Sequence, residues 1–311
     1  MKKIISIVLI LFGAAATFLS SLLICAIPVL EEGANSSWMA KLSDSTKISA
    51  LSLPGSHDSG ATHSIADFSG KCQDYGIKPQ LQMGVRFFDI RLKNSGGNLR
   101  IMHGFIDQKL SYDTFLDEVN AFINTHEKET IFLSIKNEAT DSGTSEEFAS
   151  AVLSTSKAHL GEKWAAPRTM PTTIGEVRGK VVLLSRFQAD YGVDCYSGWP
   201  GEARKEGFDI DNGIHVQDYY ALPDCEAKKA SVLECLSYAN QNATTGASPF
   251  VLNFFSGYLE NAFPMSYSVP VAKQMNPFAL EQIKNYSTTG VCIFDFVNEK
   301  LCEAVIGRNA I

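Results

Sequence analysis

Short apolar runs that end in polar or charged residues recur along most of this 311-residue chain. Helix-like stretches separate the runs, as in residues 111–128, where apolar residues recur at helical spacing. Nearly all-apolar strands that alternate with helices predict a parallel sheet covered on both faces. The runs expected to form strands are residues 48–53, 85–92, 130–135, 181–184, 250–255 and 291–296.

The number of such units predicts the architecture. About seven strand–helix units in roughly 270 residues suit an α/β fold, a single irregular (distorted) TIM-type barrel of parallel strands. A doubly wound open sheet is the alternative, but no glycine-rich dinucleotide fingerprint follows the first strand to support it. The net charge of −7 argues against a nucleic-acid partner, because phosphate backbones require clustered Lys and Arg.

The N-terminus differs from the rest of the chain. Lys2 and Lys3 precede an uncharged, mostly apolar run over residues 4–30, which indicates a secretory signal or a membrane anchor. We therefore expect a secreted or extracellular protein, or one anchored through this segment. The predicted parts are a signal peptide or membrane anchor (1–33), a short tether (34–44) and a barrel domain (45–311).

Polar side chains follow the apolar runs at their C-terminal ends. His57 and Asp58 follow the first run, and His103 follows the stretch 99–102, Leu-Arg-Ile-Met. In RFFDIRL, the alternation of side chains along a strand places Asp89 and Arg91 on one face. Four further residues occupy such strand-end positions: Lys136, Arg186, Asp218 and Asp295. In a parallel barrel these ends meet at the rim that holds active sites.

Each of these residues alone has a structural explanation. A lone histidine is usually a surface or packing residue, and a lone strand-end aspartate usually belongs to a turn. Asp89 with Arg91 could be a simple ion pair, and a single strand-end cation could extend along the surface. The functional interpretation depends on the set, in which two histidines, several carboxylates and three cations are predicted to share one rim.

The motifs that hold these residues resemble a known family. The segments LSLPGSHDSG, GVRFFDIRL and IMHG are similar to the X-region of phosphatidylinositol-specific phospholipases C, and most similar to the bacterial-type, calcium-independent branch. The similarity continues through IFLSIKNE, GKVVLLSRF, VQDYY and CIFDFVNE, and so covers residues 45–300. The resemblance implies a distorted TIM barrel and cleavage of phosphatidylinositol.

The resemblance also implies roles for individual residues. It makes His57 the general base, oriented by Asp295, and His103 the general acid, with Asp58 beside it. Arg91 is implied as the phosphate-binding cation, with Asp89 next to it. The implied inositol contacts are Lys136, Arg186, Asp218 and Tyr220, with Tyr219 as the alternative to Tyr220.

The chemistry suits these residue types. The inositol 2-hydroxyl attacks the phosphorus only if a base removes its proton, and the diacylglycerol alkoxide leaves only if an acid protonates it. The implied products are diacylglycerol and 1,2-cyclic inositol phosphate. Glycosylphosphatidylinositol anchors are a second candidate substrate.

The branch of the family determines the expected cofactor. Calcium-dependent relatives carry Asn after the first histidine and an acidic pair on the second strand, whereas this chain has Asp58 and Asp89-Ile90-Arg91. We expect no metal and no other cofactor. The expected partners are phosphatidylinositol and a membrane surface. The aromatic residues expected to contact that surface are Phe68, Tyr258, Phe263 and Tyr267. The protein is expected to be monomeric. The alternatives are a glycerophosphodiester phosphodiesterase-like hydrolase and a non-catalytic inositol-lipid-binding barrel.

Six cysteines remain once the leader residue Cys25 is set aside. An even number in a secreted protein permits disulfides. Cys225 and Cys235 are a candidate local pair. None of the cysteine spacings fits a thiolate zinc site.

Overall fold

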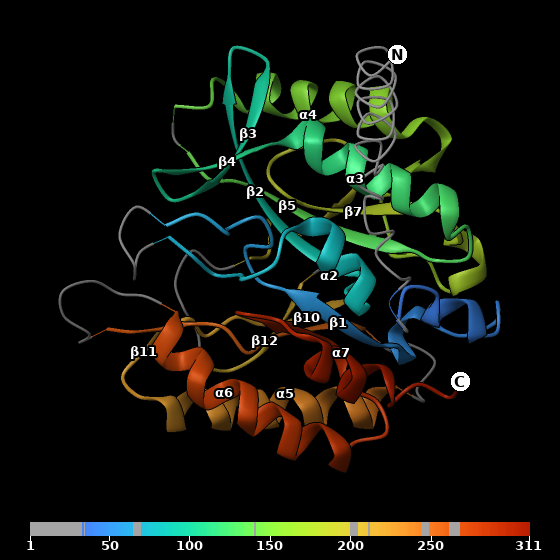
Figure 1. The fold of residues 1–311 in the computed structure, drawn as a ribbon, viewed down its shortest axis with the longest axis vertical. Coiled ribbons are helices and arrows are strands. Elements are labelled where there is room, and N and C mark those ends of the chain that lie inside the picture. Colours follow the sequence, from blue (N-terminus) through green and yellow to red (C-terminus); the bar gives the residue numbers. More distant parts are fainter. Residues whose placement is uncertain are drawn as a thin grey trace, which may run out of the picture. The chain divides into compact units, whose positions relative to one another are not determined.

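Figure 1 shows the fold in a computed structural model, which describes residues 33, 35–64, 70–139, 141–199, 205–210, 212–243, 249–260 and 268–311. The predicted leader therefore lies almost wholly outside the described residues. No helix within the described ranges is long and apolar enough to cross a membrane.

Seven strands run parallel and form the wall of the barrel. They pair side by side in the order β7, β5, β2, β1, β14, β12 and β10. Their bounds are β1 (Ser52–Ser56), β2 (Phe87–Ser95), β5 (Ile131–Asn137), β7 (Val181–Arg186), β10 (Ile214–Gln217), β12 (Phe250–Phe254) and β14 (Gly290–Phe294). The parallel TIM-type barrel predicted from the sequence is confirmed.

The barrel is irregular because its described strands do not close into a ring. Among the described residues, no pairing joins β7 or its short neighbour β8 (Val193–Asp194) to β10 or its neighbour β9 (Phe208–Ile210). β6 (Trp164–Ala165) pairs with the outer side of β7, and β9 pairs antiparallel with β10. The short strands β11 (Ala221–Leu222) and β13 (Tyr258–Leu259) pair with each other in a separate sheet.

An antiparallel hairpin is attached to β2. Its strands are β3 (Asn98–His103) and β4 (Ile106–Ser111), and β3 pairs antiparallel with β2. The prediction that the stretch before His103 is one more parallel barrel strand was wrong. β2 instead continues past the rim to Ser95, and β3 returns toward it, with Leu92 opposite Ile101.

Helices cover the strands on their outer side (Figure 1). They are α2 (Ile77–Met83), α3 (Tyr112–Thr125), α4 (Ser145–Leu160), α5 (Cys225–Asn242), α6 (Val269–Gln282) and α7 (Glu299–Ile306). Side chains cap several N-termini: Ser111 accepts from Thr114 N, and Thr144 forms a capping box with Glu147. The predicted helix at 111–128 is thus confirmed with slightly shorter bounds.

Two segments differ from the sequence-based expectation. The first strand begins at Ser52, because residues 48–50 form a short 3-10 helix instead. The described part of the predicted tether is packed against the barrel: Trp38 is buried and its Nε1 donates to Gly84 O at 3.0 Å. Glu129, in a buried ion pair with Arg86, accepts hydrogen bonds from the backbone of this segment.

Every second side chain of β2 points into the barrel. Asp89 on β2 forms an ion pair with Arg186 on β7, although β5 lies between these strands. Lower in the barrel, the rings of Phe132 and Phe250 pack with centroids 5.0 Å apart across non-adjacent strands. The interior is therefore apolar at its base and charged at the C-terminal rim, as the alternation in RFFDIRL predicts.

All six described cysteines are free thiols. The candidate pair Cys225 and Cys235 was wrong, because both lie on α5. Ten residues of α-helix separate them by about 15 Å along the axis, which is beyond the reach of a disulfide.

Candidate active site

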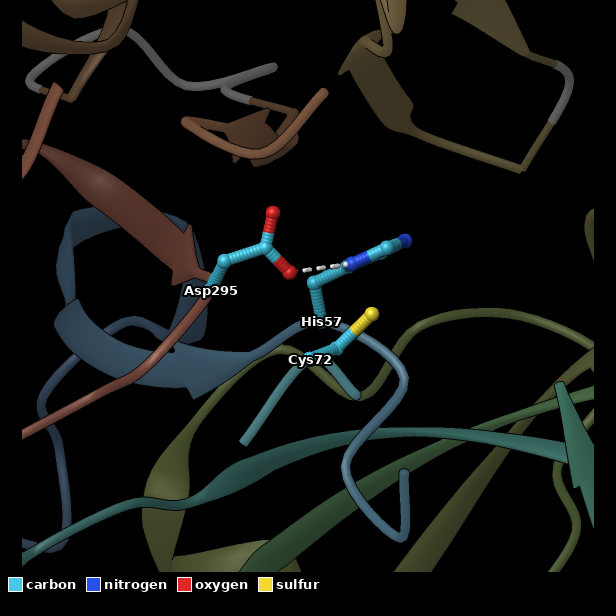
Figure 2. Close-up of side chains that lie close together, drawn as sticks. All are labelled: His57, Cys72 and Asp295. Carbon is cyan, nitrogen blue, oxygen red and sulfur yellow. Dashed lines mark hydrogen bonds and ion pairs between the residues drawn. The ribbon is translucent and has the colours of Figure 1, made fainter. Parts of the chain in front are cut away.

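The first histidine and its carboxylate follow adjacent parallel strands. Ser56 at the end of β1 pairs with Phe294 at the end of β14, so His57 and Asp295 emerge side by side. His57 Nδ1 lies 2.7 Å from Asp295 Oδ1 (Figure 2). Burial alone would lower the pKa of His57, but the Asp295 carboxylate outweighs it and raises this pKa above 6.5.

Arg91 lies directly against this histidine. Its Nη2 donates to His57 Nε2 at 2.8 Å, which leaves Nδ1 of the ring as the donor to Asp295. The same Nη2 is 3.5 Å from Asp89 Oδ2, so the two residues share a face of β2 as predicted. The side chain of Arg91 is 15% exposed and borders the cavity described below.

Carboxylates surround the Arg91 guanidinium. Nη1 is 3.4 Å from Glu138 Oε1, and Nε is 3.8 Å from Asp58 Oδ2. Burial opposes the charge on Arg91, but Asp58, Asp89 and Glu138 raise its pKa well above the usual value. In return, and against the effect of burial, the pKa values of Asp89 and Glu138 are lowered to about 2. Arg91 is therefore a permanent cation held in a fixed place.

The second histidine reaches the rim from the hairpin. His103 ends β3, and its Nδ1 lies 2.5 Å from Asp58 Oδ2. Its side chain is 33% exposed, and its other ring nitrogen is left as the atom available to a ligand. The two histidines of the predicted set thus share one site, although only His57 follows a barrel strand.

Asp58 adopts a rare backbone conformation with φ of 40°. Its amide donates to Asp89 Oδ2 at 3.1 Å, and the next residue, Ser59, donates its amide to Asp89 O and accepts from Asp89 N through Oγ. This tight turn directs His57 toward Asp295 and Asp58 toward His103.

These groups meet in a cavity of about 860 Å³. The sequence-predicted residues that line it are His57, Arg91, His103, Lys136, Arg186, Asp218 and Tyr220. The other three, Asp58, Asp89 and Asp295, are at most 1% exposed and lie behind this lining. The structure therefore brings all ten predicted site residues together, in two layers.

Cationic and aromatic side chains form the second half of the cavity wall. Arg186 stacks on Trp199 at 3.7 Å, and Trp199 Nε1 donates to Asp218 Oδ2 at 3.1 Å. Tyr220 lines the cavity and its ring packs near that of Tyr258. Tyr219, the alternative to Tyr220, is not among the lining residues.

The N-terminal half of the barrel matches a known family. Residues 51–187, which include both histidines and Arg91, match the family model of the phosphatidylinositol-specific phospholipase C X domain. Over these residues the chain is similar to this phospholipase C family.

Curated relatives and solved structures extend the similarity to most of the chain. A 1-phosphatidylinositol phosphodiesterase of Listeria monocytogenes is 26% identical over 297 residues, covering 91% of this chain and 87% of that protein. One from Staphylococcus aureus (strain Newman) is 29% identical over 280 residues, covering 83% and 87%. A structure of the Staphylococcus aureus phosphatidylinositol-specific phospholipase C gives a TM-score of 0.76 at 25% identity, covering 89% of this chain and 98% of that one.

Several residues of this site were not predicted from the sequence. Glu138 accepts from Gly104 N at 3.0 Å and from Lys136 Nζ at 2.8 Å, besides its contact with Arg91. Its position two residues after Lys136, just past the end of β5, was a usable signal, because alternate residues of an extended chain share a face. Trp199 lies in a connecting segment whose sequence gives no such signal.

A buried lysine supports the loop that holds two predicted contact residues. Lys228 on α5 is fully buried, and its Nζ donates to Gln217 Oε1 at 3.2 Å and to Tyr219 O at 2.7 Å. Burial lowers its pKa to about 7, against the opposing effect of Asp218 and Asp295. Lys228 thus fixes the backbone that presents Asp218 and Tyr220.

Cys72 is a further residue of the site that was not predicted from the sequence. It is 2% exposed, lines the cavity and lies 3.7 Å from His103 Nδ1. Burial, together with Asp295 and Asp58, raises the pKa of this thiol well above its usual range. Cys72 therefore remains a protonated thiol beside both histidine–aspartate pairs.

The predicted aromatic rim is only partly described. Phe68, Phe263 and Tyr267 lie outside the described residues, whereas Tyr258 lines the cavity. Phe105, which the sequence analysis did not single out, is 80% exposed at the tip of the β3–β4 hairpin.

Proposed function

We propose that this protein cleaves phosphatidylinositol into diacylglycerol and 1,2-cyclic inositol phosphate. The observation that carries the proposal is the placement of two histidine–carboxylate pairs on either side of Arg91 in one cavity. A non-catalytic lipid-binding barrel would not require two such pairs. The names of the curated relatives support the same substrate.

In the proposed reaction His57 is the base. With Nδ1–H donated to Asp295, its Nε2 carries the lone pair that can accept the proton of the inositol 2-hydroxyl. Asp295 stabilises the imidazolium that forms, which is consistent with its effect on the pKa of His57. Nε2 accepts from Arg91 in this structure, so the guanidinium must turn toward the phosphate when substrate binds.

Arg91 meets the charge that develops on the phosphate. A guanidinium donates two parallel hydrogen bonds to phosphate oxygens, so once Arg91 has turned from His57 to the bound phosphate its donors are already in place when negative charge develops. Asp89 contacts Nη2 of the guanidinium, and Glu138 contacts Nη1.

His103 is the proposed acid. Asp58 holds Nδ1, and the half-exposed ring presents Nε2 to the departing diacylglycerol oxygen. Lys136, Arg186, Asp218 and Tyr220 form the part of the cavity wall proposed to contact the inositol hydroxyls.

The reaction is proposed to need no divalent cation. Calcium takes six to eight oxygen ligands, typically at about 2.3–2.6 Å. In this site the Arg91 guanidinium contacts the carboxylates that would supply them, namely Asp58, Asp89 and Glu138.

The experiment that tests the function measures phosphatidylinositol turnover in excess chelator, with phosphorus NMR to identify the product. We expect the cyclic phosphate to form at the same rate in chelator and in millimolar calcium. A large loss in chelator that calcium restores would contradict the metal-independent mechanism. No turnover under either condition would contradict the function. Release of a glycosylphosphatidylinositol-anchored protein in the same buffers tests the second candidate substrate.

We also propose export and a monomeric state. The basic residues and apolar run of the leader, residues 1–33, support export, with residues 34–311 as the functional unit. Fractionation of a producing cell, followed by light scattering of the exported protein, would test both. Protein confined to the cytosol, or a stable dimer mass, would contradict them.

A further inference from the structure

Cys72 is held firmly in the wall of the active-site cavity. Its amide donates to Ala61 O at 2.8 Å, and its carbonyl accepts from Phe296 N at 2.7 Å. The thiol points toward the His57 ring (Figure 2). The metal-independent mechanism proposed above gives this side chain no role.

Two trios of potential metal ligands share this sulfur. In each trio, Cys72 Sγ, a histidine nitrogen and a carboxylate oxygen lie within 4.8 Å of one another. One trio is completed by His57 and Asp295, and the other by His103 and Asp58.

The second trio is the better cation site. Both ring nitrogens of His57 are occupied, Nδ1 by Asp295 and Nε2 by the Arg91 guanidinium at 2.8 Å. In the second trio the guanidinium is more distant, with Nε 3.8 Å from Asp58 Oδ2. His103 instead holds only its Nδ1 toward Asp58, on the same side as the sulfur.

The spacing of the second trio suits a zinc ion. Tetrahedral zinc with Zn–S of about 2.3 Å and Zn–N of about 2.0–2.1 Å separates the two ligand atoms by roughly 3.5 Å. Cys72 Sγ and His103 Nδ1 are 3.7 Å apart. His103 Nδ1 and Asp58 Oδ2 are 2.5 Å apart, so these two atoms must move apart when the ion binds between them.

An unsatisfied oxygen points to the same conclusion. Asp58 is fully buried, and its Oδ1 accepts no hydrogen bond from any residue that the structure describes. Buried carboxylate oxygens are normally satisfied, because an unpaired one is costly. A cation bound to the Asp58 carboxylate would offset that cost.

The negative charge around Cys72 disfavours a free thiolate but favours a bound divalent cation. The carboxylates Asp58 and Asp295 raise the pKa of the Cys72 thiol, and the same negative field attracts a divalent ion. Sulfur and imidazole ligands select a soft or borderline ion such as Zn²⁺ or Cd²⁺, whereas Ca²⁺ and Mg²⁺ require oxygen.

We propose that Cys72, His103 and Asp58 form an inhibitory site for Zn²⁺ and similar thiophilic divalent cations. Binding releases the thiol proton and the proton shared by His103 and Asp58 to solvent. The ion then occupies the nitrogen and carboxylate that hold the proposed acid in place, and turnover stops. The inhibitory part of this inference rests on the proposed function, whereas the binding part does not.

The binding test uses the full chain and no substrate. Co²⁺ serves as a spectroscopic probe, because a thiolate ligand gives a charge-transfer band, and calorimetry measures Zn²⁺ affinity. We expect one tight site and a cobalt–thiolate band in the wild type. Cys72→Ser should lose the band and at least tenfold in Zn²⁺ affinity, on the order of the loss that outer-shell changes already cause.

Matched variants separate this site from other thiols. Cys225→Ser makes the same change at another buried cysteine, outside both trios, and should retain the band. Asp58→Asn should also weaken Zn²⁺ binding, and it covers the case that Cys72→Ser misfolds, which circular dichroism would reveal. A band that persists in Cys72→Ser, or no Zn²⁺ binding by the wild type, would overturn the proposal.

Inhibition is measured against each variant's own rate without metal. Micromolar Zn²⁺ should block wild-type and Cys225→Ser phosphatidylinositol cleavage, chelator should reverse the block, and the same concentration of Mg²⁺ should have no effect. Cys72→Ser should need at least tenfold more Zn²⁺ for the same fractional inhibition, in line with its lost affinity. Equal inhibition of Cys72→Ser and wild type would contradict the inhibitory role even if the binding test succeeds.

Discussion

The two histidine–carboxylate pairs of the site are built in different ways. His57 and Asp295 follow adjacent parallel strands of the barrel, and the His57 side chain is 14% exposed. His103 ends a strand of an antiparallel hairpin, is 33% exposed and precedes the exposed tip at Phe105. Both members of the first pair therefore follow barrel strands, whereas the second pair joins Asp58, which follows the barrel strand β1, to His103 on the attached hairpin.

This difference matches the two proposed chemical roles. The base must meet one hydroxyl of a rigid inositol ring, which favours a fixed position. The acid must meet the oxygen of a flexible, lipid-bearing leaving group, which favours the open side of the cavity. The turn at residues 57–58 connects the two histidine–carboxylate pairs, because His57 is the proposed base and the next residue, Asp58, is the partner of the proposed acid.

The largest effect is expected from removal of either histidine. His57→Ala and His103→Ala should each reduce phosphatidylinositol turnover by about 10²–10⁴-fold, because each removes a proton-transfer group. His159→Ala, which removes a surface histidine bound to Asp113 and Asp117, is the control and should leave the rate unchanged. Normal activity in a folded His57 or His103 variant would contradict the acid–base assignment.

The next effect concerns the pH profile of the base. The base acts when neutral, and Asp295 raises the pKa of His57, so the acidic limb of kcat/KM should lie above pH 6.5. Asp295→Asn removes the raising charge and leaves burial, which lowers this pKa. The limb should therefore move to lower pH while the maximal rate falls. An unmoved limb would mean that another group controls it.

A smaller effect is expected where the hairpin meets the barrel. Glu138 accepts from Gly104 N in the hairpin and contacts Arg91 on β2. Glu138→Gln keeps its shape but weakens both contacts, so kcat should fall by about tenfold, less than the roughly 10²-fold effect of a 1 Å misplacement. Steady-state kinetics at saturating substrate measure this, and an unchanged kcat would show that the hairpin needs no such contact.

The smallest effect is expected on membrane binding. Phe105 extends from the hairpin tip beside the proposed acid, and an exposed aromatic ring suits a bilayer interface. Phe105→Ala should reduce vesicle sedimentation severalfold and leave the hydrolysis of soluble substrate intact. Tyr258→Ala, on the barrel side of the cavity, provides the comparison. Unchanged sedimentation of both variants would remove these residues from the proposed interface.

The barrel half of the site was predictable from the sequence, and the hairpin half was only partly so. Parallel strands put their C-terminal ends on one rim, which brings His57 and Asp295 together, and strand alternation does the same for Asp89 and Arg91. The stretch 99–102 is apolar apart from Arg100 and was predicted as a barrel strand, but it pairs antiparallel with β2. Pairing direction depends on the connecting turn, so local apolarity did not reveal it.

Residues in connecting segments left no readable signal. Cys72 reaches the cavity because its backbone pairs with Ala61 and Phe296, which are distant in sequence. Trp199 reaches it by stacking on Arg186. Both placements result from tertiary contacts that periodicity does not encode. The segment 34–44 lacked an apolar period, yet Trp38 anchors it to the barrel.

The most direct test of the division between the two pairs varies the leaving group. Phosphatidylinositol is compared with an inositol phosphate ester of a nitrophenol, which departs without protonation. On the activated ester, the deficit of His103→Ala relative to wild type should shrink by about 10-fold or more, since no acid is needed. The deficit of His57→Ala should be the same on both substrates. Equal deficits for both variants on both substrates, or recovery by His57→Ala instead, would contradict the assignment of base and acid.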